Sequence, residues 1–104
     1  MSEVTTKENL ALTIDEAEWQ WLKPHTERGV LIIVADGLDL AEAGFRIARD
    51  DAELVRSWIV TGRLGKPTPE QIATWDQTPE LRFQMLIVSP YILMKAQSGQ
   101  LYNA

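Results

Sequence analysis

The aliphatic run at residues 30–34 predicts the clearest element of the chain, a strand. Five aliphatic residues follow one another there, four of them β-branched, and Gly29 and Gly37 bound the segment. A short apolar run between glycines is typical of a strand that is buried on both faces. The turn residues Asp36 and Gly37 then end the strand and lead into a helix.

A first helix is predicted before this strand. Thr13 and Glu16 form a capping box, and apolar residues recur at helical spacing on the face that contains Trp21. Pro24 disfavours helical geometry in the residue before it, so the helix is expected to end or kink at Lys23.

A second helix is predicted to begin directly after the strand. Asp39 is its capping residue, Glu42 completes the box, and an apolar stripe follows at helical spacing. Gly44 lies on that stripe, where the absence of a side chain lets another element approach closely.

Two more helices follow, each marked by its capping residues. Asp50 with Glu53 predicts a helix that ends at Gly62, and Thr68 with Gln71 predicts a short one. Residues 83–94 are strand-like on both sides of Pro90, so they form either one bent strand or the two strands of a hairpin.

These elements predict one α+β domain over residues 12–97, with a frayed segment at residues 1–11 and a tail at residues 98–104. About four helices are expected to cover a small sheet of two or three strands. The order is helix, strand, helix, helix, helix, then one or two strands. The same order, with two helices joined by a tight turn at Arg49-Asp50-Asp51, is that of a winged helix-turn-helix domain.

Composition excludes several functions. The chain has 104 residues, a net charge of −5 and no cysteine. There is therefore no thiolate zinc site and no cysteine nucleophile, and a nucleic-acid or membrane partner is not expected because phosphate binding needs a basic surface. The first residues contain no apolar signal segment and no apolar run reaches the length of a membrane span, so we expect a soluble cytoplasmic protein.

A pattern of aromatic, proline, glycine and charged positions runs through nearly the whole chain. It consists of Trp19, Leu22-x-Pro24-His25-x-x-Arg28-Gly29, Leu38-Asp39-Leu40, Asp50-Asp51, Val55-x-x-Trp58, Gly62, Lys66-Pro67, Trp75 and Phe83-x-x-Leu86-Ile87-Val88-x-Pro90-Tyr91-Ile92-Leu93. With this pattern the chain resembles the bacterial domain-of-unknown-function family 2288. It departs from the family at Tyr91, where a tryptophan is expected, and the resemblance implies no activity, cofactor or site residue.

The candidates for catalysis centre on His25, the one histidine of the chain. With Arg28, and with Asp39 or Asp51 brought near by the fold, it has the chemistry of a general base or an anion ligand. The alternative is a histidine that caps the end of the first helix. Asp39 and Asp50 already have a local explanation as helix caps, and the chain has no metal-binding loop pattern, so neither a metal nor a cofactor is expected.

Arg56 and Trp19 are the candidates for binding. Arg56 is an outward reader if the helix that follows Asp51 recognises nucleic acid, although the acidic first turn of that helix opposes phosphate. Trp19 and Trp21 are about 200° apart around a helix, so Trp19 is expected to be partly exposed at an interface.

The uncharged segment at residues 85–94 is difficult to bury within so small a domain. We therefore expect a homodimer, with this segment or the Trp19 face at the contact. The main functional interpretation is a non-enzymatic interaction or regulatory module with an unidentified protein partner. The two alternatives are a winged-helix-like nucleic-acid binder and a small enzyme or ligand-binding protein that uses His25 and Arg28 with an aspartate.

Overall fold

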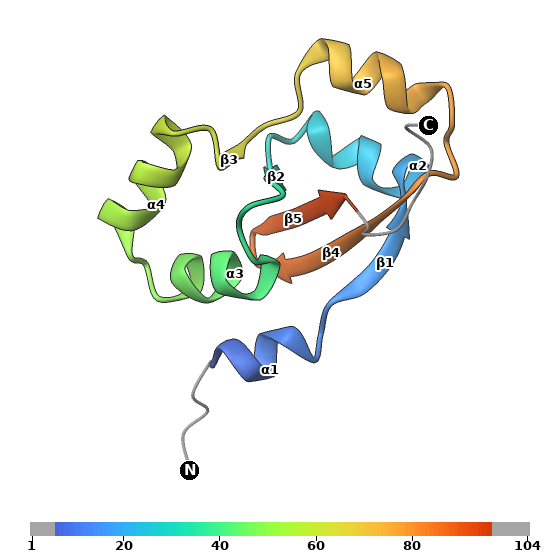
Figure 1. Cartoon of the computed structure of the whole chain (residues 1–104). Helices are drawn as coiled ribbons and strands as arrows, with labels where there is room; N and C mark the ends of the chain where they lie inside the picture. Colours follow the sequence, from blue (N-terminus) through green and yellow to red (C-terminus); the bar gives the residue numbers. More distant parts are fainter. Residues whose placement is uncertain (1–5, 97–104) are drawn as a thin grey trace.

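The structure is a computed structural model, and it describes residues 6–96 (Figure 1). The expected tail at 98–104 and the first five residues of the expected frayed segment lie outside this range. The elements are α1 (Lys7–Ala11), β1 (Asp15–Glu18), α2 (Trp19–Leu22), the 3₁₀ helix η1 (Lys23–Thr26), β2 (Leu31–Val34), α3 (Leu40–Ala48), α4 (Ala52–Val60), β3 (Leu64–Gly65), α5 (Pro69–Asp76), β4 (Arg82–Val88) and β5 (Tyr91–Ala96).

The sheet has five strands in the order β1-β4-β5-β2-β3, so it is larger than the two or three strands predicted. Strands β2 and β5 pair in parallel, and the other pairs are antiparallel. The α+β class is confirmed. The winged-helix arrangement is not, because the C-terminal strands lie at the centre of the sheet rather than in a wing beside two helices.

Residues 83–94 form a hairpin, which decides between the two arrangements left open by the sequence. Strands β4 and β5 pair from Phe83 with Ala96 to Val88 with Tyr91, and Ser89-Pro90 is the turn, with a cis peptide bond. Part of this apolar segment is buried within one chain: Leu86, Leu93 and Met94 are inaccessible to solvent, whereas Ile87 and Tyr91 are 55% and 40% exposed. The predicted homodimer stays a prediction.

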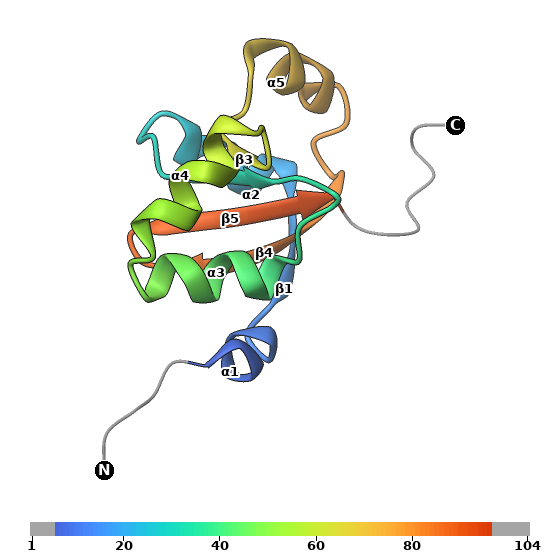
Figure 2. The ribbon, with the colours of Figure 1, turned by 60° about the vertical axis from the view of Figure 1, so that its left-hand side comes forward.

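Both faces of the sheet are covered by helices, and each face has its own core. On one face, side chains of α3 and α4 pack on strand residues such as Val34, Leu86 and Leu93. On the other, Trp19 and Leu22 of α2 pack with strand residues and with α5. Figures 1 and 2 show α5 and α1 at opposite ends of the molecule. Neighbouring strand residues point to opposite faces, so the apolar runs of β2, β4 and β5 serve both cores.

The predicted start of the first helix at Thr13 is wrong. Residues 15–18 form edge strand β1, which pairs with β4; α2 begins only at Trp19 and changes to the 3₁₀ helix η1 at Lys23. Glu16 does not cap a helix but forms an ion pair with Arg82 across the strands at 3.0 Å. The Thr13 hydroxyl donates to the Leu10 carbonyl at 2.8 Å and so belongs to the end of α1. Pairing with a distant strand has overridden the local helical signal.

Residues 7–11, which were expected to be frayed, form helix α1. The Thr6 side chain accepts a hydrogen bond from the Asn9 backbone N–H at 3.1 Å and caps this helix. Lys7 forms an ion pair with Glu42 of α3 at 3.5 Å, and Leu10 packs against the core of that face.

Three of the predicted helix boundaries are confirmed and one is shifted. Asp39 caps α3, accepting from the Glu42 backbone N–H at 2.9 Å, and Thr68 caps α5 with a complete capping box. Gly62 ends α4 with a φ of 81°. The predicted Asp50 cap is wrong, because α4 begins one residue later: Asp51 occupies the capping position and Asp50 has a φ of 61°.

Gly44 fills the role expected of it. A Cβ atom on Gly44 would lie 2.5 Å from Leu86 Cδ2 and 3.3 Å from Val88 Cγ2, so α3 can pack on β4 at this distance only with glycine. Leu86 is fully buried, so its side chain would have to shift within the core to admit the Cβ.

We expect Gly44→Ala to lower the free energy of unfolding by about 1 kcal/mol in urea denaturation. Glycine to alanine in a helix usually stabilises by up to about 1 kcal/mol, but overpacking a filled core costs about 1–3 kcal/mol. Gly37→Ala is the control, because no atom lies within 4 Å of the added Cβ, and it should change stability by less than about 0.5 kcal/mol. A stabilised Gly44→Ala variant would contradict the close contact.

Candidate functional site

A groove of about 750 Å³ lies beside α4, and we call it the α4 groove. It is formed by α4, the end of α3, and the end of the sheet at which the parallel strands β2 and β5 begin. Its lining residues are Gly29, Ile32, Ile47, Asp50, Asp51, Ala52, Val55, Arg56, Ile59, Leu64, Gly65, Lys66 and Tyr91.

The helical repeat of α4 explains why this helix has a second apolar face. Leu54 and Trp58 point into the core below α3 and α4. Val55 and Ile59, four residues apart on a neighbouring stripe, line the groove together with Arg56. The core on this side of the sheet thus continues into an open groove, and Ile59 remains 56% exposed.

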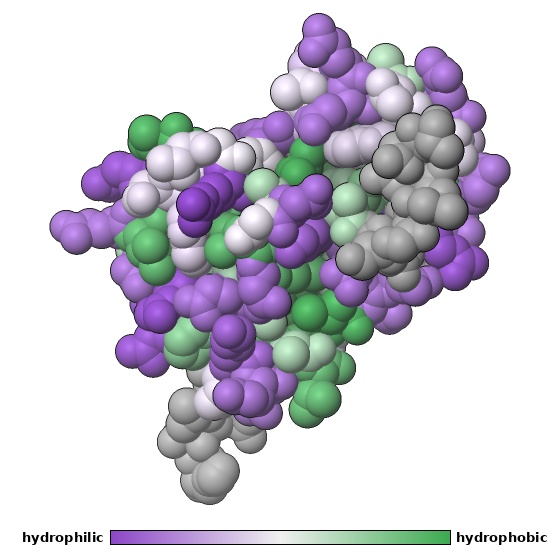
Figure 3. Space-filling model, in the orientation of Figure 1, coloured by the Kyte–Doolittle hydropathy of each residue, from purple (hydrophilic) through white to green (hydrophobic). Residues whose placement is uncertain are grey.

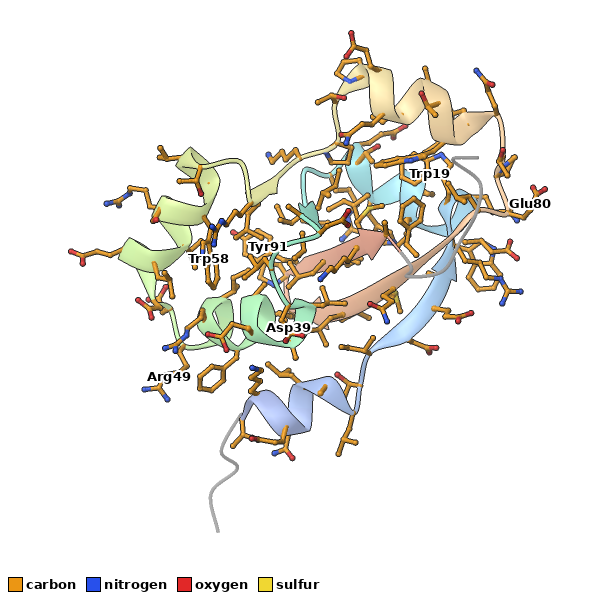
Figure 4. All side chains as sticks on the ribbon, viewed as in Figure 1. Trp19, Asp39, Arg49, Trp58, Glu80 and Tyr91 are labelled. Carbon is orange, nitrogen blue, oxygen red and sulfur yellow. The ribbon has the colours of Figure 1, made fainter. Side chains whose placement is uncertain are left out.

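Tyr91 forms part of the opposite wall. It is the first residue of β5, it is 40% exposed, and it lies between α4 and the sheet in Figure 4. In the view of Figure 3, hydrophobic residues reach the surface over α4 and near α1 and β1, between larger hydrophilic areas. The α4 groove therefore combines apolar walls with access from solvent.

The charged residues of the groove differ in how they are paired. Asp51 lies 3.5 Å from Arg46 Nη1, and the same guanidinium binds Glu42 at 2.8 Å, so this carboxylate has a cation beside it. Among residues 6–96, neither Arg56 nor Lys66 forms an ion pair or a side-chain hydrogen bond. The groove therefore presents two cations without a protein partner in the described chain.

A smaller cavity of about 360 Å³ lies on the other side of β3. Trp75 and Phe83 line it, as do Lys95 and the shared residues Gly65 and Lys66. The Lys95 ammonium already donates to the Leu38 carbonyl at 2.6 Å, and Trp75 and Phe83 contact each other edge to face. This cavity is smaller than the α4 groove. Several of its lining side chains already make hydrogen bonds or ring contacts within the fold.

The predicted catalytic candidates are spread over several elements. His25 lies in η1, partly buried, and its Nδ1 is buried without a hydrogen-bond partner; Arg28 is exposed in the turn that follows. Asp39 and Asp51 lie at opposite ends of α3, whose nine residues span roughly 14 Å. Of these four residues, only Asp51 lines the α4 groove.

The two binding candidates have different environments. Arg56 is exposed and lines the α4 groove. Trp19, which was expected to be partly exposed, is 1% exposed, whereas Trp21 is 70% exposed. The expected exposure was reversed because the helix assumed from residue 13 does not exist. Trp19 begins α2 immediately after β1, and its backbone N–H donates to the Leu81 carbonyl at 2.7 Å.

Trp19 is a core residue that joins α2 to α5 (Figure 4). Its ring contacts Trp75 at 4.9 Å between centroids, and its indole N–H donates to Asp76 Oδ1 at 2.8 Å. This hydrogen bond, with that of Lys23, holds the pKa of Asp76 below its usual value. The resulting stabilisation is present above the pKa of the unfolded carboxyl and is lost as the pH falls through the lower folded pKa.

We expect Trp19→Phe to lower the free energy of unfolding by about 2 kcal/mol, because the smaller ring leaves a cavity and removes the hydrogen bond to Asp76. Trp21→Phe is the matched control and should change stability by less than about 0.5 kcal/mol, since Trp21 is exposed. Urea denaturation followed by circular dichroism measures the free energy of unfolding of both variants. Equal effects of the two substitutions would contradict a buried Trp19 and an exposed Trp21.

Sequence reasoning missed most of the α4 groove. Asp51 and Arg56 were among the candidates, but Ile59 was assigned to a buried helix face, and Lys66 and Tyr91 were not considered together. The useful signal was the excess of apolar residues in α4, where Val55, Ile59 and Val60 add to the face already formed by Leu54 and Trp58. A helix of nine residues needs only one such face to pack on a sheet.

No helix of the described residues is long and apolar enough to cross a membrane. Within the same range, no three histidine, aspartate or glutamate side chains are grouped as metal ligands. The class that the fold and the groove define is a small α+β domain with one large amphipathic groove.

The chain belongs to the family described as protein of unknown function (DUF2288), whose family model matches residues 5–96. It is similar to a solution structure determined by NMR, that of PA1075 from Pseudomonas aeruginosa, with 26% sequence identity and a TM-score of 0.74. The similarity covers 98% of this chain and 97% of that chain. No curated protein matches the sequence.

Proposed function

We propose that this protein is a non-enzymatic binding module and that its ligand lies in the α4 groove. The observation that carries the proposal is the groove itself, an open volume of about 750 Å³ with aliphatic and aromatic walls and a few charged residues. Ligand sites in proteins have this character and a volume of roughly 300–1,000 Å³.

The enzymatic alternative has less support. It requires His25 and Arg28 to act with Asp39 or Asp51, but these aspartates cap different helices and only Asp51 lines the groove. General acid–base catalysis needs its groups within hydrogen-bond reach of one substrate. A binding role requires no such constellation.

We also propose that the chain forms a homodimer, with the contact limited to the apolar residues that remain exposed. Of residues 85–94, Ile87 and Tyr91 are the large hydrophobic residues that stay exposed, and Ile59 and Val60 add exposed apolar area on α4. A second copy that covered α4 would compete with a small ligand for the groove. A sedimentation measurement with and without ligand separates the two kinds of occupant. A cytoplasmic location and an unidentified protein partner complete the proposed role.

Binding of the fluorescent apolar probe 8-anilinonaphthalene-1-sulfonate tests this function. We expect the native protein to bind one equivalent and Ile59→Ser to weaken binding by about tenfold, because a buried apolar contact worth about 1–1.5 kcal/mol is lost. Val60→Ser is the matched control: Val60 is the next residue of α4, is 79% exposed and does not line the groove. Its affinity should stay within about twofold of the native value.

Two results would contradict the proposal. The first is no saturable binding to the folded protein. The second is equal weakening by Ile59→Ser and Val60→Ser, which would place the probe outside the groove. Circular dichroism of each variant excludes unfolding as the cause of a changed signal.

A further inference from the structure

Resting on the proposed function, we infer that the ligand of the α4 groove is a small organic acid with an apolar body, whose carboxylate binds between Arg56 and Lys66. The inference starts from the unequal pairing of charges in the groove. Asp51 has Arg46 beside it, whereas Asp50, Arg56 and Lys66 form no ion pair among residues 6–96. The lining groups without a partner are therefore two cations and one carboxylate, and a bound anion balances the excess positive charge.

The position of Lys66 supports an anion site at the groove wall. Lys66 Nζ lies 3.4 Å from the place that a Cβ would occupy on Gly29, so the ammonium lies close to the turn before β2. Arg56 lines the same groove from α4. A guanidinium and an ammonium in one groove suit a carboxylate, which accepts charge-assisted hydrogen bonds through both oxygens.

The number and setting of the charges favour one negative group over many. A polyanion such as nucleic acid would also meet Asp50 and Asp51, which line the same groove, and the chain carries a net charge of −5. Phosphate backbones are bound by extended basic surfaces. Two cations among acidic residues fit a monoanion better than a polyanion.

The remaining lining residues define the body of the acid. Ile32 and Leu64 come from the sheet, and Ile47, Val55 and Ile59 come from the helices. They provide aliphatic walls without a hydrogen-bonding side chain, so the part of the ligand between them is a hydrocarbon chain or ring. The Tyr91 ring contributes further apolar contact from β5.

Three eight-carbon probes that differ only in the head group test the inference: octanoate, octanol and octylammonium. Each is titrated into the full chain at pH 7 and followed by amide chemical shifts. We expect octanoate to bind about tenfold more tightly than octanol, and octylammonium to bind most weakly. The groove amides, including those of Arg56 and Lys66, should shift with octanoate.

Two variants and one control assign the head-group preference. Arg56→Gln and Lys66→Gln should each reduce octanoate affinity by about fivefold to tenfold and leave octanol affinity within about twofold. Arg49→Gln is the control, because the Arg49 guanidinium lies 5.4 Å from the Phe45 ring centroid and does not line the groove (Figure 4). It should leave both affinities within about twofold of the native values.

The outcomes separate this inference from the function on which it rests. Equal binding of all three probes in the groove, or preference for octylammonium, overturns the carboxylate assignment and leaves the groove as a binding site. Octanoate binding that is unaffected by both Arg56→Gln and Lys66→Gln also overturns it. Absence of binding by every probe at millimolar concentration contradicts the carboxylate site and the proposed function together.

Discussion

The β4–β5 hairpin is the constraint on which the rest of the structure depends. It lies at the centre of the sheet and is apolar on both faces, with Leu86 and Leu93 on one side and Phe83 and Met94 on the other, all buried. A sheet of this kind is stable in water only when helices cover both faces. The helices α3 and α4 cover one face and α2 with α5 covers the other, so the chain has two cores around one sheet.

With the hairpin inside the sheet, β1 and β3 form its two edges. Edge strands expose unpaired backbone groups and favour association with other chains unless they are short or charged. Strand β1 is four residues long and carries three acidic side chains, and β3 is only two residues long. The large hydrophobic residues that remain exposed are Leu12, Trp21, Ile59, Val60, Ile87 and Tyr91, and none of them lies in β1 or β3. Ile59 and Tyr91 line the α4 groove, so the groove is a better candidate for binding than an edge strand.

The sequence predicted the elements whose signals are local. The strand at 31–34 and the Asp39 and Thr68 caps depend on residues within a few positions, and each was found as expected. Strand β1 was missed because its partner is distant: Glu16 and Arg82 are 66 residues apart in the chain. That error also reversed the exposure of Trp19 and Trp21.

The candidate site was predicted less well than the fold. Asp51 and Arg56 were identified from their charge, but their common location depends on how α4 lies against the sheet. Lys66 and Tyr91 reach the groove from β3 and β5, two strands separated in the sheet order by β2. No spacing in the sequence relates them, so a groove built from five elements can be recognised only when the topology is known.

The measurement that tests the central claim most directly is a map of amide chemical shifts of the full chain with the apolar anion 8-anilinonaphthalene-1-sulfonate. The account predicts that the largest changes fall on α4, at Leu64–Lys66 and at Tyr91, which together surround the α4 groove. Changes concentrated around Trp75 and Phe83 would instead place binding in the smaller cavity. Either that result or changes spread evenly over the molecule would contradict the α4 groove as the binding site.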